Sequence, residues 1–234
     1  MRGRGGESSS GFEACLPPMV DISVGLAIIA LLYAFSESLA LGKVEAYLRR
    51  DDKKAALAHQ VQSQFPNEFR AGKMTIGGEE NVQRFTFNEG VLFRKNEAGI
   101  EGLVPGALGI LQRFGRVLVS NQRLFEEVIV EGHTDERAID TARYPSNWEL
   151  SAARATTLVH IFSSPEVGLQ PSKLRIHAAA YGQYLPLAAQ RAAAHPNWSE
   201  DRKERDIYSR DRRVVVAVYY SMEAIRRELD AGVR

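Results

Sequence analysis

Cysteine is almost absent from this chain of 234 residues, in which Cys15 is the only one. A single cysteine cannot form a disulfide within the chain, so a domain exported from the cytoplasm would depend on its hydrophobic core alone, which this length permits. Cys15 also precedes the main apolar segment, whereas a lipoprotein processing signal places its cysteine after that segment. We therefore expect neither an internal disulfide nor a lipid-modified cysteine.

The chain also has little net charge, since 30 Lys and Arg residues against 29 Asp and Glu residues leave +1. Such a balance gives no bulk electrostatic attraction to nucleic acid. The five histidines show no spacing typical of metal ligands. His133 and Ser151 suggest a catalytic pair, but neither lies in a nucleophile-elbow pattern and no oxyanion-hole motif is visible. We predict no enzyme activity, no metal, no cofactor and no nucleic-acid partner, and we interpret His133 as structural.

Only one apolar run is long enough to concern a membrane. Residues 19–41 are mostly apolar, and their cleanest part, residues 22–35, has 14 residues, which alone suits a buried helix or a signal-peptide core. The 21 residues from Asp21 to Leu41 would form roughly 30 Å of helix, enough to cross a bilayer. Because the apolar region of a signal peptide is normally uncharged, Asp21 favours an uncleaved single-span anchor; a signal cleaved near Ala40 is the alternative.

The segments on either side of this run differ from it in composition. Residues 1–18 are rich in Arg, Gly and Ser and predict a flexible tail. Residues 42–80 predict an amphipathic connector helix, with apolar positions at Val44, Tyr47 and Val61, followed by a loop over residues 72–81. We predict a folded domain over residues 81–222 and a C-terminal tail over residues 223–234.

Strand and helix patterns alternate within the predicted domain. The unbroken apolar run of residues 214–220 is typical of a strand buried on both faces. Such an alternation predicts an α/β sandwich in which helices pack over a small mixed sheet. The other expected strands cover residues 85–87, 91–93, 125–130 and 174–178, the helices cover residues 105–120 and a segment from Asn147, and residues 188–210 form a polar loop.

Polar side chains gather at the end of one of these strands, in the sequence Gly132-His133-Thr134-Asp135. After a loop, Asn147 is a good N-cap for a helix that carries Arg154. A carboxylate at a strand end beside an arginine on a helix suits the binding of a zwitterion.

The order Gly-His-Thr-Asp, a loop and Asn-x-x-Leu-Ser-x-x-Arg-Ala, here residues 132–135 and 147–155, closely resembles the OmpA-like peptidoglycan-binding domain. Residues 144–151, Tyr-Pro-Ser-Asn-Trp-Glu-Leu-Ser, resemble most the version in MotB, the B subunit of flagellar stators. The resemblance implies an OmpA-like fold behind a single transmembrane helix.

The ligand implied by this resemblance is the diaminopimelate of the peptidoglycan stem peptide, whose side chain ends in an ammonium and a carboxylate. Asp135 would accept from the ammonium, and Arg154 would hold the carboxylate through a bidentate fork. The alternative is that these two residues form only a structural ion pair. The resemblance adds neutral contacts from Thr134 and Asn147, and a contact from Arg212 or Arg213, although Asp211 replaces the asparagine that usually precedes these arginines.

Asp21 is the candidate for ion transport, because stator B subunits carry the translocated ion on an aspartate near the cytoplasmic end of the span. A carboxylate inside hydrocarbon is costly and is usually functional. The alternative is a plain N-cap, since Asp21 follows Pro17-Pro18 and would begin the helix. The preceding residues 16–20 resemble the anchors of the related proteins TolR and ExbD about as well as they resemble the corresponding residues of a stator B subunit.

The resemblance implies a peptidoglycan-anchored subunit of a proton- or sodium-driven MotAB-like motor. Its homodimer would place two spans inside a ring of multi-span MotA- or ZorA-like subunits, and residues 43–64 would be either a plug over the ion path or a connector. Only 114 residues separate Asp21 from Asp135 (135 minus 21), closer to Zorya anti-phage systems than to flagellar stators. A passive membrane-to-wall anchor is the alternative function.

The expected location is the bacterial inner membrane, with a cytoplasmic N-terminus and a periplasmic C-terminal domain. The charges disagree, because Lys43 and four further basic residues up to Lys54 follow the span, while only Arg2 and Arg4 precede it. The positive-inside rule alone favours the opposite orientation. We nevertheless predict a cytoplasmic N-terminus, because the C-terminal domain must lie outside the cytoplasm to reach its ligand.

Overall fold

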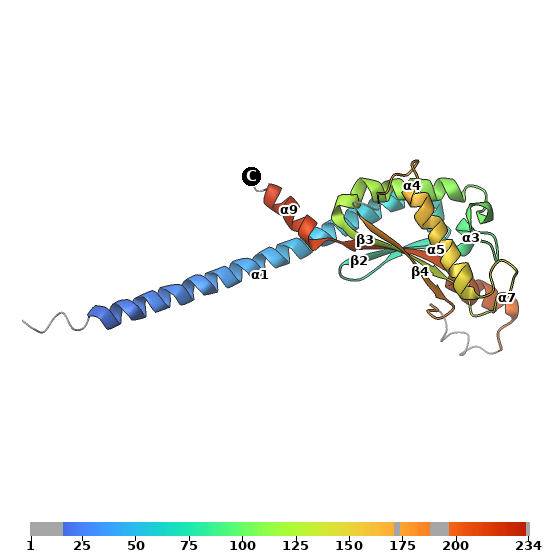
Figure 1. Ribbon diagram of the computed structural model, residues 1–234. Helices are drawn as coiled ribbons and strands as arrows, with labels where there is room; N and C mark the ends of the chain where they lie inside the picture. The colour runs from blue at the N-terminus through green and yellow to red at the C-terminus, as the bar shows by residue number, and fades with distance from the viewer. Residues whose placement is uncertain (1–15, 171–173, 188–196, 233–234) are drawn as a thin grey trace, which may run out of the picture. The chain divides into compact units, whose positions relative to one another are not determined.

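The computed structural model describes residues 16–170, 174–187 and 197–232, so the predicted tail lies almost wholly outside the described residues. The chain divides into two compact units, residues 1–48 and residues 49–234. Helix α1 (Leu16–Gln64) supplies the described part of the first unit and continues into the second (Figure 1). Because α1 begins at Leu16, Asp21 lies inside the helix, and the expectation that Asp21 begins it is wrong.

Helix α1 has the composition of a membrane span over its first half. Among the described residues it is the one helix long and apolar enough to cross a bilayer, with a mean hydropathy of 2.0 in its most apolar window. Large apolar side chains, among them Leu31 and Phe35, are exposed along this part of the helix. The length and apolarity expected for a single transmembrane helix are therefore present.

The second unit is built on a five-stranded sheet of order β1-β2-β5-β3-β4, which confirms the predicted small mixed sheet. The parallel pair is β3 with β4, and the other neighbours are antiparallel. Strand β5 lies at the centre, and six consecutive residues from Arg213 to Val218 are buried, which confirms a strand covered on both faces. The strands are β1 (Met74–Gly77), β2 (Val82–Asn88), β3 (Phe125–His133), β4 (Arg175–Gly182) and β5 (Arg213–Tyr220).

Helices cover one face of this sheet and meet it around Phe114 (Figure 1). Phe114 lies on α4 (Ala107–Asn121), and its ring centroid is 5.2 Å from that of Phe85 and 5.1 Å from that of Phe87 on β2. It also lies 6.1 Å from the ring of Phe162 on α5 (Asn147–Ser163). One apolar core thus joins the sheet to both helices.

The second half of α1 belongs to the same core. Leu57 and Val61 are almost fully buried in it. Hydrogen bonds fix the helix to the start of β2: Lys54 Nζ donates to the carbonyl of Glu80 at 2.9 Å, and Gln83 Nε2 donates to the carbonyl of Lys54 at 3.0 Å. This part of α1 is packed as a connector, and its release as a plug would expose apolar side chains to water.

Four segments differ from the sequence-based expectations. The predicted loop at residues 72–81 contains β1, an edge strand stabilised by pairing with β2. Residues 89–92 form the short helix α3 (Glu89–Leu92) instead of a strand. The described part of the predicted polar loop is helical through α7 (Glu200–Lys203), the π-helix η3 (Glu204–Tyr208) and α8 (Ser209–Asp211), while residues 188–196 lie outside the described residues.

The predicted C-terminal tail contains the helix α9 (Met222–Gly232), which is anchored by the buried Ile225. Its apolar residues Met222, Ile225 and Leu229 recur at helical spacing, so the sequence contained a helix signal that the prediction of a tail missed. The remaining short elements are α2 (Pro66–Arg70) and the 3-10 turns η1 (Ile100–Gly102) and η2 (Gln122–Leu124).

Gly132 permits the close approach of β3 and α5. A Cβ at this position would lie 2.1 Å from the backbone oxygen of Ser151, which cannot move without displacing the helix. We expect Gly132→Ala to lower the free energy of unfolding of the full chain by about 3 kcal/mol, as overpacking against backbone does. Chemical denaturation in detergent measures this loss.

Gly109→Ala in α4 is the matched control, because a Cβ there meets no atom within 4 Å. It should gain about 0.5–1 kcal/mol from the lower backbone entropy of alanine in a helix. Equal stabilities of the two variants would contradict the close approach.

Candidate functional site

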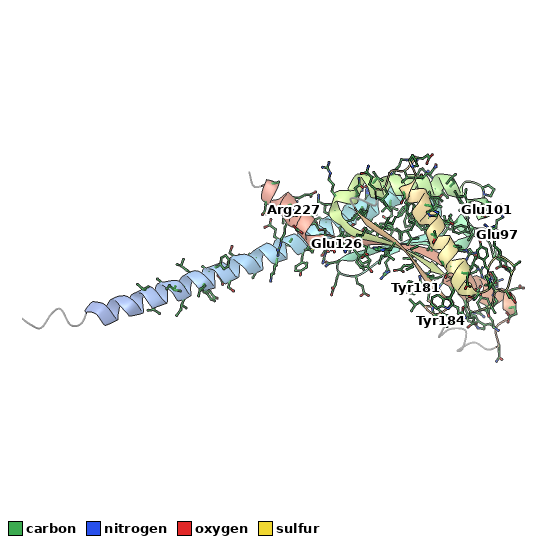
Figure 2. All side chains as sticks on the ribbon, viewed as in Figure 1. Glu97, Glu101, Glu126, Tyr181, Tyr184 and Arg227 are labelled. Atoms are coloured by element: carbon green, nitrogen blue, oxygen red, sulfur yellow. The ribbon has the colours of Figure 1, made fainter. Side chains whose placement is uncertain are left out.

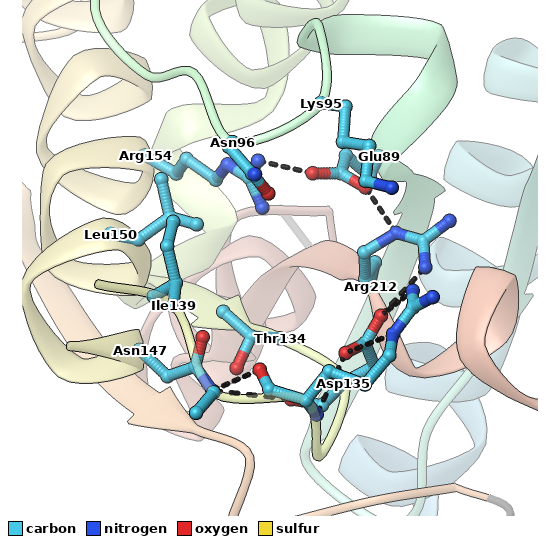
Figure 3. Close-up of a pocket in the computed structure, with 12 residues that line it drawn as sticks. Glu89, Lys95, Asn96, Thr134, Asp135, Ile139, Asn147, Leu150, Arg154 and Arg212 are labelled. Atoms are coloured by element: carbon cyan, nitrogen blue, oxygen red, sulfur yellow. Dashed lines mark hydrogen bonds and ion pairs between the residues drawn. The ribbon is translucent and has the colours of Figure 1, made fainter. Parts of the chain in front are cut away.

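A pocket of about 240 Å³ opens where β3 ends and β5 begins (Figure 3). The strand register explains why these two strand ends lie together, because His133 at the end of β3 pairs with Arg213 at the start of β5. Residues just beyond these strand ends therefore face one another, with the start of α5 beside them. The pocket is lined by Glu89, Lys95, Asn96, Thr134, Asp135, Arg137, Ala138, Ile139, Asn147, Leu150, Arg154 and Arg212.

Asp135 carries the negative charge on one side of the pocket. It is 5% exposed, and its Oδ2 accepts from Arg212 Nη1 at 2.6 Å, while its Oδ1 accepts from Arg137 Nε at 3.1 Å. Burial acts to raise the pKa of Asp135, but the hydrogen bonds from Arg137 and Arg212 outweigh it and hold the pKa below its usual value. Asp135 is therefore a carboxylate at neutral pH.

Arg154 carries a positive charge on another side of the pocket. It is 1% exposed, forms an ion pair with Glu89, and donates from Nε to the carbonyl of Glu97 at 2.9 Å. Burial lowers the pKa of Arg154, and the Glu89 carboxylate opposes that shift. Within the described residues no ion pair joins Asp135 to Arg154, which speaks against the alternative that the two form only a structural ion pair with each other.

Arg212 connects the two sides. Its guanidinium binds Glu89, Asp135 and, at 2.5 Å, Glu204 of the π-helix. Burial acts to lower the pKa of Arg212, but the three carboxylates raise it above its usual value. Figure 3 shows the resulting chain of alternating charges along the wall, from Arg154 through Glu89 and Arg212 to Asp135.

Thr134 and Asn147 add neutral polar groups to the same pocket. The Thr134 side chain is buried, and its Oγ1 has no hydrogen-bond partner among the described residues. Asn147 Nδ2 donates to the carbonyl of Arg137 at 3.0 Å and to Gln183 Oε1 at 2.9 Å. Asn147 is not the N-cap that we expected: Ser146 is, because its Oγ accepts from the backbone N–H of Trp148.

Arg213 does not line the pocket. Its guanidinium donates to the carbonyls of Asp211 and Leu185, each at 3.0 Å, so it supports the chain around the start of β5. Asp211, which replaces the expected asparagine, accepts from the backbone N–H of Leu187 at 2.7 Å. Of the two adjacent arginines, the structure brings only Arg212 to the other predicted site residues.

His133 and Ser151 have structural surroundings. His133 stacks on Tyr181 with ring centroids 5.0 Å apart, and its Nε2 lies 3.6 Å from Glu131 Oε2. Burial lowers the pKa of His133 and favours the neutral imidazole. Ser151 Oγ donates to the carbonyl of Trp148 and accepts from the N–H of Gly182. No cluster of three metal-ligating side chains occurs among the residues that the structure describes.

Four charged residues at the site, Glu89, Lys95, Arg137 and Glu204, were not predicted from the sequence. Glu89 lay between two expected strands and Glu204 in an expected loop, while Arg137 follows Asp135 by two positions. Of these residues only Arg137 could have been recognised from the sequence, because it lies two positions after the candidate carboxylate Asp135. Burial of Glu89 is visible only after folding, because its partners lie 65 and 123 positions away along the chain.

Comparisons with known proteins identify the domain. Residues 92–198 match the model of the OmpA family. The uncharacterized protein YtxE of Bacillus subtilis is 33% identical over 147 residues, which are 63% of this chain and 57% of that protein. Motility protein B of the same organism is 26% identical over 64% of this chain and 48% of its own length. The chain thus spans about half the length of these relatives.

Solved structures agree on the fold. A putative MotB-like protein from Desulfovibrio vulgaris superimposes with a TM-score of 0.56 at 21% identity, covering 74% of this chain and 99% of that one. The cell wall anchor of the type VI secretion system from Pseudomonas aeruginosa gives 0.52 at 23% identity, covering 69% and 97%. The predicted resemblance to MotB-like proteins with an OmpA-like domain is confirmed.

Proposed function

We propose that this chain anchors a membrane complex to peptidoglycan by binding the diaminopimelate of a stem peptide in the pocket at the end of β3. The observation that carries the proposal is a pocket whose buried wall holds a carboxylate, guanidinium groups and an unpartnered hydroxyl. A ligand that ends in an ammonium and a carboxylate matches these groups. The similarity to a cell wall anchor and to Motility protein B supports this choice.

The charges assign a role to each residue. Asp135 accepts from the ligand ammonium in exchange for one of the four hydrogen bonds that it now accepts from Arg137 and Arg212, since these occupy all the lone pairs of the carboxylate. Arg154 and Arg212 donate to the ligand carboxylate with N–H groups that remain after Glu89 is bound. Thr134 Oγ1 supplies a neutral hydrogen bond, and Asn147 holds the wall of the pocket through the carbonyl of Arg137.

These existing ion pairs affect selectivity more than affinity. The arginines and carboxylates of the wall are already paired, so the ligand exchanges some contacts instead of neutralising free charges. Such complementary charge arrangements chiefly select the right ligand and exclude wrong ones. A lysine side chain, which lacks the second carboxylate, would leave the Arg154 side of the pocket without a ligand partner.

We further propose that the anchored complex is an ion-driven motor of the MotAB type, with Asp21 as the ion carrier. The motif of residues 144–151, the apolar α1 and the position of Asp21 inside it support this role. The partners would be a second copy of the chain and a ring of MotA- or ZorA-like subunits in the inner membrane, with the C-terminal domain in the periplasm. A passive membrane-to-wall anchor is the second candidate, because the pocket serves it equally well.

The test of wall binding uses the full chain in detergent and its sedimentation with purified diaminopimelate-type peptidoglycan. Free meso-diaminopimelate should compete for binding, and Nα-acetyl-lysine amide, whose side chain ends in an ammonium without a carboxylate, should not. Thr134→Val should weaken binding about three- to tenfold, the value of one hydrogen bond, while the stability of the fold is unchanged because Oγ1 has no partner in the free protein. Ser120→Ala on the exposed side of α4 is the control.

Two results would contradict the proposal. The first is equal sedimentation with diaminopimelate-type and lysine-type peptidoglycan. The second is competition by Nα-acetyl-lysine amide as effective as competition by diaminopimelate.

A further inference from the structure

Two large aromatic rings lie exposed and stacked on each other beside the pocket. Trp148, in the first turn of α5, and Tyr184, just beyond β4, have ring centroids 5.2 Å apart and planes inclined by 26°. Their exposed fractions are 46% and 61%, and Leu185 and Leu187 next to them are also exposed. Figure 2 places Tyr184 at the surface of the folded unit. An exposed apolar cluster of this kind marks a binding surface more often than a chance exposure.

The ring pair is held by hydrogen bonds of the backbone and of neighbouring side chains. The N–H of Trp148 donates to Ser146 Oγ at 3.1 Å, which fixes the start of α5. Asn147 Nδ2 donates to Gln183 Oε1, and the N–H of Gly182 donates to Ser151 Oγ at 3.1 Å, so the end of β4 is tied to α5. These bonds hold the backbone that carries both rings, and the rings contact each other by stacking, which together lower the entropic cost of binding a ligand.

The ring pair is continuous with the pocket. Asn147 lines the pocket, and Trp148 follows it at a Cα separation of about 3.8 Å. Gln183, which binds Asn147, directly precedes Tyr184. A ligand that leaves the pocket over the start of α5 therefore reaches the two rings first.

We propose that Trp148 and Tyr184 form a carbohydrate subsite that stacks on a sugar ring of the glycan strand. This inference rests on the proposed function, since the sugar belongs to the same polymer as the stem peptide in the pocket. The peptide joins diaminopimelate to an amino sugar through a short run of residues, each spanning at most about 3.6 Å. The C–H groups on the face of a pyranose are attracted to the negative face of an aromatic ring.

The neutral character of the surface favours a sugar over a charged partner. The four side chains of the cluster, Trp148, Tyr184, Leu185 and Leu187, carry no formal charge at neutral pH, whereas the pocket beside them is strongly charged. Peptidoglycan has the matching order, a charged peptide end followed by a hydroxylated ring. The two surfaces together would thus bind one repeating unit of the polymer.

The experiment compares two soluble ligands on the full chain in detergent by calorimetry. One is a disaccharide tripeptide that ends in diaminopimelate, and the other is the same tripeptide without sugars. We expect the sugars to tighten binding about three- to tenfold. Trp148→Ala should abolish this gain and leave the affinity for the bare tripeptide within about twofold, since the ring lies outside the pocket. Trp148→Phe should retain most of it.

Leu108→Ala is the matched control, because this exposed apolar residue lies on α4 and does not line the pocket. A wild-type protein that binds both ligands equally would overturn the subsite and leave wall binding intact, whereas failure to bind either ligand would overturn the proposed function. An equal loss of affinity for both ligands in Trp148→Ala would mean that the ring only supports the pocket and does not bind a sugar. A change of oligomeric state in place of a lost sugar preference would make the surface a protein contact.

Discussion

Arg154→Lys should reduce binding of diaminopimelate-type peptidoglycan by about 10- to 150-fold. Lysine keeps the positive charge beside Glu89 but cannot form the bidentate contact with a ligand carboxylate, and a charge-assisted contact contributes about 1.5–3 kcal/mol. Calorimetry with the diaminopimelate-ending tripeptide measures the loss. Arg116→Lys on the exposed face of α4 is the control and should bind normally.

Arg154→Ala should lower stability more than Arg154→Lys, because it removes the positive charge that now pairs with the buried Glu89 carboxylate. Breaking a buried ion pair from one side costs about 3–5 kcal/mol where the remaining charge has no other partner; because Glu89 keeps Arg212, this variant should lose less stability than that, as well as losing binding. The double variant Glu89→Ala with Arg154→Ala should recover part of the stability and none of the binding. Binding by Arg154→Lys at the wild-type affinity would remove Arg154 from the site.

Asp21→Asn should abolish the output of the motor while the protein reaches the membrane and binds peptidoglycan normally. Asparagine has nearly the same size as aspartate but carries no charge and exchanges no proton, so it cannot carry the ion. Because α1 begins at Leu16, the helix does not need a cap at this position, and Asn should not disturb it. The measurement is activity of the whole system, with its multi-span partner, at matched protein levels.

Glu37→Gln is the control for this prediction, since Glu37 is the other carboxylate within residues 19–41. It should retain the output if the role belongs to Asp21 alone. Full activity of Asp21→Asn would favour the passive anchor, and loss of activity in both variants would point to a general need for charge in the helix.

The sequence predicted those parts of the fold whose pattern is contained within one short stretch of residues. The apolar run that forms β5 and the helical stripe that places Phe114 in the core are both visible in the order of the residues. Strand β1 is not, because its four residues, Met74–Gly77, are stabilised by pairing with β2 and have no strong pattern of their own. The second half of α1 looked like a separate connector because the burial of Leu57 and Val61 depends on distant residues.

The candidate site was likewise predicted only in part. Thr134, Asp135, Asn147, Arg154 and Arg212 were recognised from a motif, and the structure brings all of them to one pocket. Their immediate partners were not recognised, because Glu89 and Glu204 acquire their importance from contacts across the sheet end. The ion pairs of the site therefore differ from the Asp135–Arg154 pair that was the alternative to ligand binding, although the residues expected at the site are largely those found there.

Strand β5 also determines how the domain would respond to tension. It begins at Arg213 beside the pocket and ends at Tyr220, whose N–H donates to the carbonyl of Asn81, and Asn81 Oδ1 in turn accepts from Arg50 of α1 at 2.6 Å. A pull between a wall-bound pocket and α1 would run along this strand. Because β5 is hydrogen-bonded along its length to β2 on one side and β3 on the other, sliding it out of the sheet would break both ladders. The anchor would then fail at a rate set by its unfolding barrier, and not by the weakest single bond.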